Sequence, residues 1–272
     1  MGFNIIFNST GIINFAQGEF AMFGGLFAYS FAVALHLPLL LAVVLAIAAT
    51  ALIGAAMERA VVYPLRNASI ITAIIATIGA SIFFKAIGFL FWPKVAYKVP
   101  EFTSGNLSLP KATVSMQFLW VLGLTAISVV LVYVFFNRTK AGKAMRACSI
   151  NRQAASLVGI NVSRMSLYAF TLAAALGALA GLVNAPFAGY SIGLFLGIKG
   201  FTAAILGGLG NTFGAVTGGL VLGISEQLIT GFLTLIVGVS TGYENAVAAA
   251  LLILILLLRP QGLVGRGVVE KV

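Results

Sequence analysis

Few of the 272 residues carry side chains that could catalyse a reaction, and those few are scattered. The sequence has one histidine, His36, one cysteine, Cys148, and no aspartate. No group of His, Cys and Glu has the spacing of a zinc site. No GxxxxGK[ST] phosphate-binding loop is present, because Gly142 and Lys143 are followed by Ala144. We therefore expect no catalytic residue, metal site or bound cofactor on this chain, and no ATP hydrolysis by it alone.

The most unusual polar residues lie in an apolar segment near the start, GIINFAQGEFAMFGG. In a helix with about 100° per residue, Asn14 and Gln17 share one face with small residues, whereas Glu19 projects elsewhere. Polar groups inside a membrane helix are costly and usually face other helices or a water-filled path. Two interpretations follow, hydrogen bonds between helices or the lining of a substrate path.

The composition indicates a membrane as the solvent for the elements that hold these residues. Hydrophobic residues make up 61% of the chain and charged residues 8%, and the mean hydropathy is +1.10. A soluble domain usually has about 25% charged residues, whereas a membrane-spanning helix needs about 20 mostly apolar ones. The sequence therefore predicts an all-α fold, a single polytopic transmembrane domain over 1–272 with about eight spans, in a range of about seven to nine.

Charges and prolines divide the apolar runs into individual spans. The expected spans are 11–35, 37–57, 69–92, 117–136, 166–183, 200–224, 228–240 and 245–258. A shorter apolar run, 185–197, is interrupted by Pro186 and by glycines. It is interpreted either as a further span or as a re-entrant segment, which is tolerated where protein or a cavity covers it.

The distribution of basic residues predicts the orientation. The connection 137–164 contains six Lys or Arg and no acidic residue, which is typical of a cytoplasmic loop. Counting spans from it places Arg59, Arg66 and the C-terminus in the cytoplasm, and the proline-containing stretch 93–116 outside as an external loop. The net charge of +10 is thereby explained by membrane orientation, and we expect no nucleic-acid partner.

Small residues recur at intervals of four. Glycines at positions 177 and 181, at 189, 193 and 197, and at 210, 214 and 218 would each line one helix face. Such faces allow helix backbones to approach closely in a membrane. The pattern predicts tight helix packing, with sliding or bending during transport as the alternative.

The basic connection has internal order. Residues 143–159 are typical of a short helix, and Gly159 is suited to the left-handed conformation that ends a helix. Asn161 would then help to turn the chain back toward the membrane. A helix in this place is suited to docking a motor domain, or to attracting lipid headgroups through its basic residues.

Three segments together resemble the permeases of branched-chain amino acid ABC importers. GIINFAQGEFAMFGG at 11–25 is similar to the family's Asn-Phe-Ala-His-Gly-Glu motif, with Gln17 in place of His. GKAMRACSINRQAASLVGINV at 142–162 is similar to the Glu-Ala-Ala…Gly coupling loop of ABC permeases, with Gln153 in place of Glu. AILGGLGNTFGAVTGGLVLG at 204–223 is similar to a late Gly-rich segment. Weaker likenesses are ATIGASIF at 76–83 and LRPQGL at 258–263.

This resemblance implies a multi-pass subunit of the bacterial inner membrane that works by alternating access. The implied partners are a second, homologous permease subunit, two cytoplasmic ATP-binding subunits that hold ATP and Mg²⁺, an external solute-binding protein and membrane lipid. The substrate path is expected to include Asn14, Gln17, Glu19, Thr77, Gly207, Gly208 and Asn211. The ATPase-coupling loop, 137–164, is expected to act through Arg146, Gln153, Ala154, Ala155, Gly159 and Ile160.

Several alternatives stay open at the level of sequence. Permeases for urea and short amides look similar, and the permease pair could be identical or different chains. A secondary transporter would need a buried coupling carboxylate, for which Glu226 and Glu244 are the candidates among the late spans. A membrane scaffold would explain the small-residue faces alone. Members of the family usually carry one more span before the first motif, so we expect this chain to lack that span.

Overall fold

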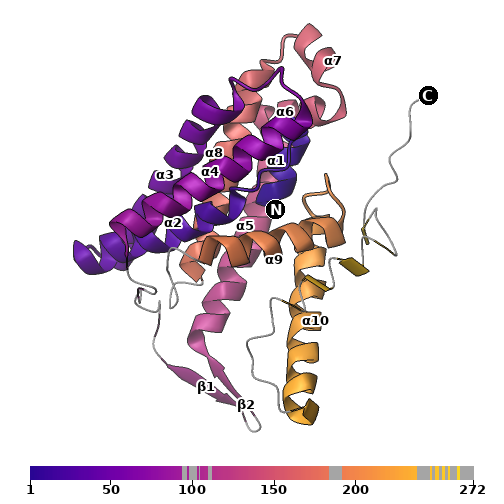
Figure 1. Ribbon diagram of the computed structural model, residues 1–272. Helices are drawn as coiled ribbons and strands as arrows, with labels where there is room; N and C mark the ends of the chain where they lie inside the picture. The colour runs from indigo at the N-terminus through magenta and orange to yellow at the C-terminus, as the bar shows by residue number, and fades with distance from the viewer. Residues whose placement is uncertain are drawn as a thin grey trace.

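The computed structural model describes residues 1–93, 105–109, 112–183 and 192–237, with a few single residues between 97 and 103 and between 246 and 263. It is a bundle of α-helices with one small hairpin (Figure 1). The described helices are α1 (Gly2–Thr10), α2 (Gln17–Tyr29), α3 (Leu39–Met57), α4 (Ile70–Phe91), α5 (Met116–Arg138), α6 (Lys140–Ile150), α7 (Arg152–Leu157), α8 (Val162–Val183), α9 (Ile192–Gly207) and α10 (Gly214–Val237). Two π-helical turns, η1 (Ser30–Ala34) and η2 (Glu58–Val62), extend α2 and α3.

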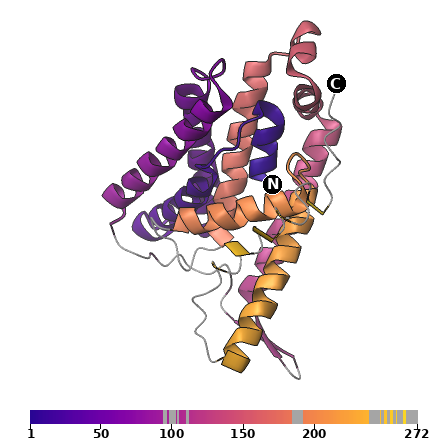
Figure 2. The ribbon, with the colours of Figure 1, turned by 45° about the vertical axis from the view of Figure 1, so that its right-hand side comes forward.

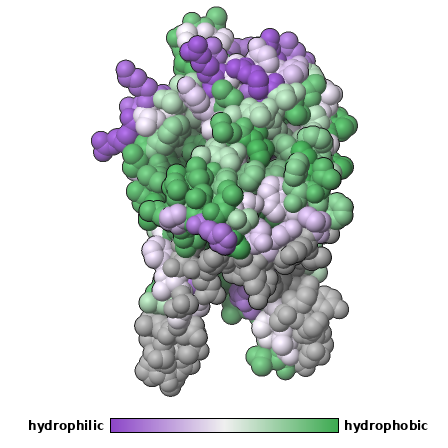
Figure 3. Space-filling model, turned by 90° about the vertical axis from the view of Figure 1, so that its left-hand side faces the viewer, coloured by the Kyte–Doolittle hydropathy of each residue, from purple (hydrophilic) through white to green (hydrophobic). Residues whose placement is uncertain are grey.

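The predicted all-α membrane fold is confirmed. Within the described residues, five helices are long and apolar enough to cross a membrane by length and composition: Leu39–Val62, Ile70–Phe91, Met116–Arg138, Val162–Val183 and Gly214–Phe232. Figure 3 shows a broad hydrophobic band on one face of the molecule, with hydrophilic residues gathered at the end where α7 lies in Figure 1. A band of this kind is suited to contact with lipid.

Helix α8 lies at the centre of the bundle, in contact with α1, α2 and α3. Its buried face meets small residues of its neighbours. Gly181 lies against the Ala21 carbonyl of α2, Gly24 of α2 lies against Ala178, and Gly54 of α3 lies against Phe170. A β-carbon at any of these glycines would meet a neighbouring backbone. The close helix packing predicted from the glycine spacing is therefore confirmed for the set at 177 and 181.

The other two glycine sets need correction. Gly193 and Gly197 of α9 do share a face, which meets Gly18 of α2, while position 189 lies outside the described residues. Gly214 and Gly218 of α10 pack against α9. Gly210 does not belong to this helical face, because it precedes α10 and has a φ of 91°.

The prediction of a single span over 200–224 is wrong. Helix α9 ends at Gly207 and α10 begins at Gly214, so a turn divides the predicted segment. Figure 2 shows the two helices meeting at an angle beside this turn. Much of the predicted span 228–240 belongs to α10 instead. Most of the predicted span 245–258 lies outside the described residues. So does the first part of the predicted segment 185–197, whose remainder, from Ile192, opens α9.

The first predicted span also begins later than expected. Residues 11–16 are not helical, and α2 starts at Gln17. Before it lies a helix that the sequence analysis did not anticipate, α1, which ends at Gly11 in the left-handed conformation with a φ of 69°. Asn14 therefore does not share a helix face with Gln17.

The stretch 93–116 contains a feature that was not expected. Its described part forms a two-stranded antiparallel hairpin of β1 (Asn106–Leu109) and β2 (Ala112–Ser115), in which Asn106 pairs with Ser115. The hairpin leads directly into α5. It is a local addition to a fold that is otherwise helical in its described residues.

Candidate functional site

A cavity of about 570 Å³ lies between α1, α2, α5, α8, α9 and α10. Most of its walls are apolar side chains of α5, α8, α9 and α10, such as Leu124, Leu176, Leu196 and Leu220. Its polar lining residues include Gln17, Thr125, Ser128, Lys199 and Glu226. Its size is within the usual range for a small-molecule site, about 300–1,000 Å³.

Of the seven residues expected on the substrate path, Gln17 alone lines this cavity. Its Nε2 donates a hydrogen bond to the Ala173 carbonyl of α8 at 2.9 Å. Its Oε1 is buried and has no hydrogen-bond partner among the described residues. The sequence allowed two roles for Gln17, a hydrogen bond between helices or a place on the substrate path. In the structure it has both features, because its Nε2 joins α2 to α8 and the residue lines the cavity.

Asn14 and Thr77 have structural contacts away from the cavity. The Asn14 Oδ1 accepts a hydrogen bond from the Ala16 backbone nitrogen at 3.0 Å, which shapes the chain just before α2. Thr77 of α4 accepts from the Phe15 backbone nitrogen at 3.3 Å. These two residues therefore fix the non-helical segment 11–16 against α4.

Glu19 points to a different side of α2 from Gln17, as predicted. Its Oε1 accepts a hydrogen bond from the Ser81 hydroxyl of α4 at 3.0 Å, and Gly193 of α9 lies next to its carboxylate. Glu19 is buried but does not line the cavity. The structure therefore gives it contacts between α2, α4 and α9.

Gly207 ends α9, and Gly208 and Asn211 belong to the turn between α9 and α10. The Asn211 Oδ1 accepts from the Gly214 backbone nitrogen at 2.9 Å and so caps the start of α10. Gly208 has a φ of 100°, which favours glycine. The side chain of Asn4 in α1 donates to the carbonyls of Gly208, at 3.2 Å, and Asn211, at 2.7 Å. This turn is thus held by α1 and lies outside the cavity lining.

Replacing Asn4 with alanine is expected to loosen this turn. The change removes two side-chain hydrogen bonds, each worth about 0.5–1.5 kcal/mol, while the two carbonyls keep the backbone nitrogens of Asn211 and Ala215 as donors. We expect a lower melting temperature of the purified protein in detergent. Asn8→Ala is the matched control, because the Asn8 side chain donates a single hydrogen bond to the turn, to the Gly210 carbonyl at 2.7 Å, and is less buried. Equal melting of Asn4→Ala and wild type would contradict the assignment.

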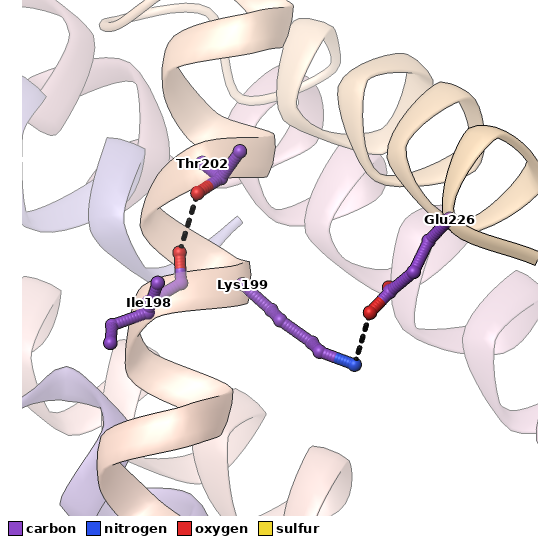
Figure 4. Close-up of polar contacts among 4 residues, drawn as sticks. All are labelled: Ile198, Lys199, Thr202 and Glu226. Atoms are coloured by element: carbon purple, nitrogen blue, oxygen red, sulfur yellow. Dashed lines mark hydrogen bonds and ion pairs between the residues drawn. The ribbon is translucent and has the colours of Figure 1, made fainter. Parts of the chain in front are cut away.

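An ion pair in the cavity wall was missed by the sequence analysis. The Nζ of Lys199 in α9 lies 2.6 Å from the Glu226 Oε1 in α10 (Figure 4). Glu226 falls between the predicted spans 200–224 and 228–240, but it lies in the middle part of α10. Lys199 lies one turn before Thr202, whose hydroxyl donates to the Ile198 carbonyl at 2.9 Å. A lysine inside an apolar segment was the signal that could have drawn attention to this site.

The predicted coupling loop forms two short helices, because Asn151 divides the expected helix over 143–159. The Oδ1 of Asn151 accepts from the Ala154 backbone nitrogen at 3.0 Å and caps α7. Gly159 ends α7 with a φ of 87°, as predicted. The Ile160 nitrogen donates back to the Ala155 carbonyl at 3.0 Å, which completes the helix end. Asn161 then caps α8 through the Arg164 nitrogen at 3.0 Å, so its expected role in turning the chain is also confirmed.

The loop residues divide into an inner and an outer group. Ala155 is buried in an apolar cluster with Ile5, Met145 and Met165. The Arg146 guanidinium donates to the Phe136 carbonyl and, at 2.9 Å, to the Asn137 Oδ1, so it closes the end of α5. In contrast, Gln153, Ala154 and Gly159 are exposed, and Ile160 is half-buried.

Three large apolar side chains project from this basic loop. Ile150, Leu157 and Val158 are 84%, 87% and 76% exposed, and we call them the apolar knob. Nearby, Arg152 donates to the Thr10 carbonyl at the end of α1 at 2.8 Å. The knob is therefore tied through α7 to α1, the helix that holds the turn between α9 and α10.

Cys148 of α6 is buried in the apolar cluster that also contains Ala155, and it is expected to react slowly. It is 1% exposed, and burial raises the pKa of its thiol although Arg152 acts in the opposite direction. Because the thiolate is the reactive form, we expect maleimide labelling at pH 7 to be far slower in the native protein than after denaturation. The native rate should still be rising above pH 9. Labelling at the rate of a free thiol at pH 7 would show that the α6–α7 packing is absent in solution.

Comparison with known proteins gives these features their context. The family model for the branched-chain amino acid transport system, permease component, matches residues 1–256. The chain belongs to this family. The permease LivH of Escherichia coli (strain K12) is 34% identical over 290 residues, which cover 100% of this chain and 92% of LivH. The permease BraD of Pseudomonas aeruginosa is 33% identical over 288 residues, again with 100% and 92% coverage.

Membership of the permease family settles the class of this protein. It is a multi-pass membrane subunit of an ABC transport system, which functions with other subunits and is not an enzyme by itself. This finding favours the permease interpretation over the secondary-transporter, scaffold and urea-permease alternatives.

Proposed function

We propose that this permease passes branched-chain amino acids through the cavity between α2, α5, α8, α9 and α10. The observation that supports this most directly is the chemistry of the cavity wall. Apolar side chains of α5, α8 and α9 suit an aliphatic side chain, and the polar group of Gln17, Lys199 and Glu226 suits the charged backbone of an amino acid.

A second cavity is less suitable for this cargo. It measures about 680 Å³ and lies between α2, α3 and α4, with aromatic and aliphatic residues such as Phe23, Phe84 and Phe91 in its wall. It offers no charged side chain to an amino acid among its lining residues. Phe83 and Phe91 of its wall are largely exposed, which favours membrane lipid as its neighbour.

Coupling to ATP hydrolysis is proposed to occur at the loop 137–164, on the cytoplasmic side. Two ATP-binding subunits, one for each of two homologous permease subunits, would hold ATP and Mg²⁺ and dock on the apolar knob. Gln153, Ala154 and Gly159 are exposed beside the knob and would take part in the contact. The Arg152 bond to α1 supports a path for motion toward the turn at 208–213.

The loop 93–116 would face outside, toward a solute-binding protein that delivers the cargo, and the C-terminus would be cytoplasmic. The basic residues of 137–164 support this orientation through the positive-inside tendency.

The proposal is tested by reconstituting the permease with its partner permease, ATPase subunits and binding protein in liposomes. We expect ATP-dependent uptake of radiolabelled leucine, isoleucine or valine, and ATPase activity that rises when the loaded binding protein is added. Uptake without ATP would overturn the coupling to ATPases. Uptake of urea or short amides but of none of the three amino acids would overturn the proposed cargo.

A further inference from the structure

The ion pair of the cavity places both signs of charge in an otherwise mainly apolar wall. Lys199 and Glu226 are the charged side chains among the described lining residues. The Glu226 side chain is 8% exposed and that of Lys199 is 28% exposed. Figure 4 shows the two side chains reaching toward each other from α9 and α10. The pair is thus largely removed from water and yet borders the space where a solute could pass.

Such a pair is a weak source of stability. Removing two charges from water costs several kcal/mol for each ion, and their attraction often does no more than offset this loss. Replacing a buried ion pair by apolar residues of similar volume is often neutral or stabilising. The fold alone therefore gives little reason for placing these charges at the cavity.

A zwitterionic solute gives such a reason. An amino acid carries an ammonium and a carboxylate, and transfer of either charge into an apolar cavity is costly unless an opposite charge receives it. Lys199 can receive the carboxylate and Glu226 the ammonium. Because the solute has no net charge, the site stays electrically neutral whether it is empty or occupied.

We propose that Lys199 and Glu226 form the recognition site for the backbone charges of the transported amino acid, exchanging their mutual contact for contacts with the solute. This inference rests on the proposed function, which it deepens by naming the residues that select a zwitterion. Gln17, whose buried Oε1 has no hydrogen-bond partner among the described residues, is a further polar residue of the cavity lining.

The helical setting of the pair suits a site that opens and closes. Lys199 and Glu226 lie on opposite sides of the turn at 208–213, so a change in the angle between α9 and α10 changes their separation. A closed pair would leave the solute without charge partners and favour its release. An open pair would favour its binding.

The test uses the complete importer in liposomes with three variants, Lys199→Met, Glu226→Gln and the double variant Lys199→Met with Glu226→Leu. We expect each to lower the kcat/KM for leucine uptake by about tenfold to a hundredfold, the effect of losing one or two charge-assisted hydrogen bonds. The double variant is decisive, because it leaves no unpaired charge and should assemble with normal yield. Lys85→Met is the control, since it removes a lysine of α4 that does not line the cavity.

The outcomes separate recognition from structure. If the double variant assembles with its partner subunits and loses leucine uptake while Lys85→Met keeps it, recognition is supported. If it takes up leucine at the wild-type rate, the pair is only structural and the inference is overturned. If the wild-type importer takes up no branched-chain amino acid, the proposed function itself is wrong. This result differs from overturning the recognition site, in which the wild-type importer and the double variant both take up leucine.

Discussion

Replacing Leu157 and Val158 together with aspartate is expected to abolish ATP-driven transport while leaving the permease folded. Both side chains are largely exposed, so the change costs the isolated permease little. In the complex, however, each would lose an apolar contact of about 1.5–3 kcal/mol. The summed loss corresponds to at least about a hundredfold weaker binding of an ATPase subunit, and burial of the new carboxylates would add to it.

The measurement is co-purification of the ATPase subunits with the tagged permease, followed by uptake in liposomes. Ser163→Asp is the matched control. It adds a negative charge to the same loop, but in the first turn of α8, where an acidic side chain is favourable. Normal ATPase recovery with Leu157→Asp and Val158→Asp combined would show that the apolar knob does not dock the motor. In that case lipid headgroups would be the better partner for this loop.

Replacing Gly181 with leucine is expected to prevent the bundle from forming. The new β-carbon would overlap the Ala21 carbonyl oxygen and lie 2.7 Å from the Ala21 carbonyl carbon and 3.0 Å from the Gly25 nitrogen. All three atoms are backbone, so α2 and α8 must separate. Overpacking usually costs about 1–3 kcal/mol, and a clash with a rigid backbone lies at or beyond the upper end.

Membrane accumulation and monodispersity in detergent provide the measurement. We expect Gly181→Leu to give little protein of normal size. Gly123→Leu is the control, because a β-carbon at Gly123 of α5 meets nothing within 4 Å and the side chain would point into open space. Normal accumulation and melting of Gly181→Leu would contradict the close approach of α2 and α8.

The membrane character and several of its helices could be predicted from the sequence, because their signals are local. The predicted spans 37–57, 69–92 and 117–136 agree closely with α3, α4 and α5. Each is an apolar run of sufficient length that ends at charges or proline, and such a run is helical in lipid whatever its neighbours are. Gly159 was likewise predictable, because a left-handed helix end depends on glycine itself.

The division of 200–224 into two helices could not be predicted from apolar content. The segment is continuously apolar, and its turn is stabilised by Asn4, 204 positions before Gly208 in the chain. The positive-φ glycines and the capping Asn211 were local signs of a turn. Gly208 and Asn211 were instead interpreted as part of a substrate path, and Gly210 as part of a helix face.

The candidate site was likewise decided by tertiary structure, because its residues are brought together by contacts between helices. The sequence by itself determined that the chain is a helical membrane protein and, through its motifs, which family it resembles. It also indicated Gln17 as a cavity residue. Only the folded bundle brings Lys199 of α9 to Glu226 of α10, and only it turns Glu19 toward α4. Hydropathy is a property of each segment, whereas a cavity and its charge pairs depend on the angles at which distant segments pack.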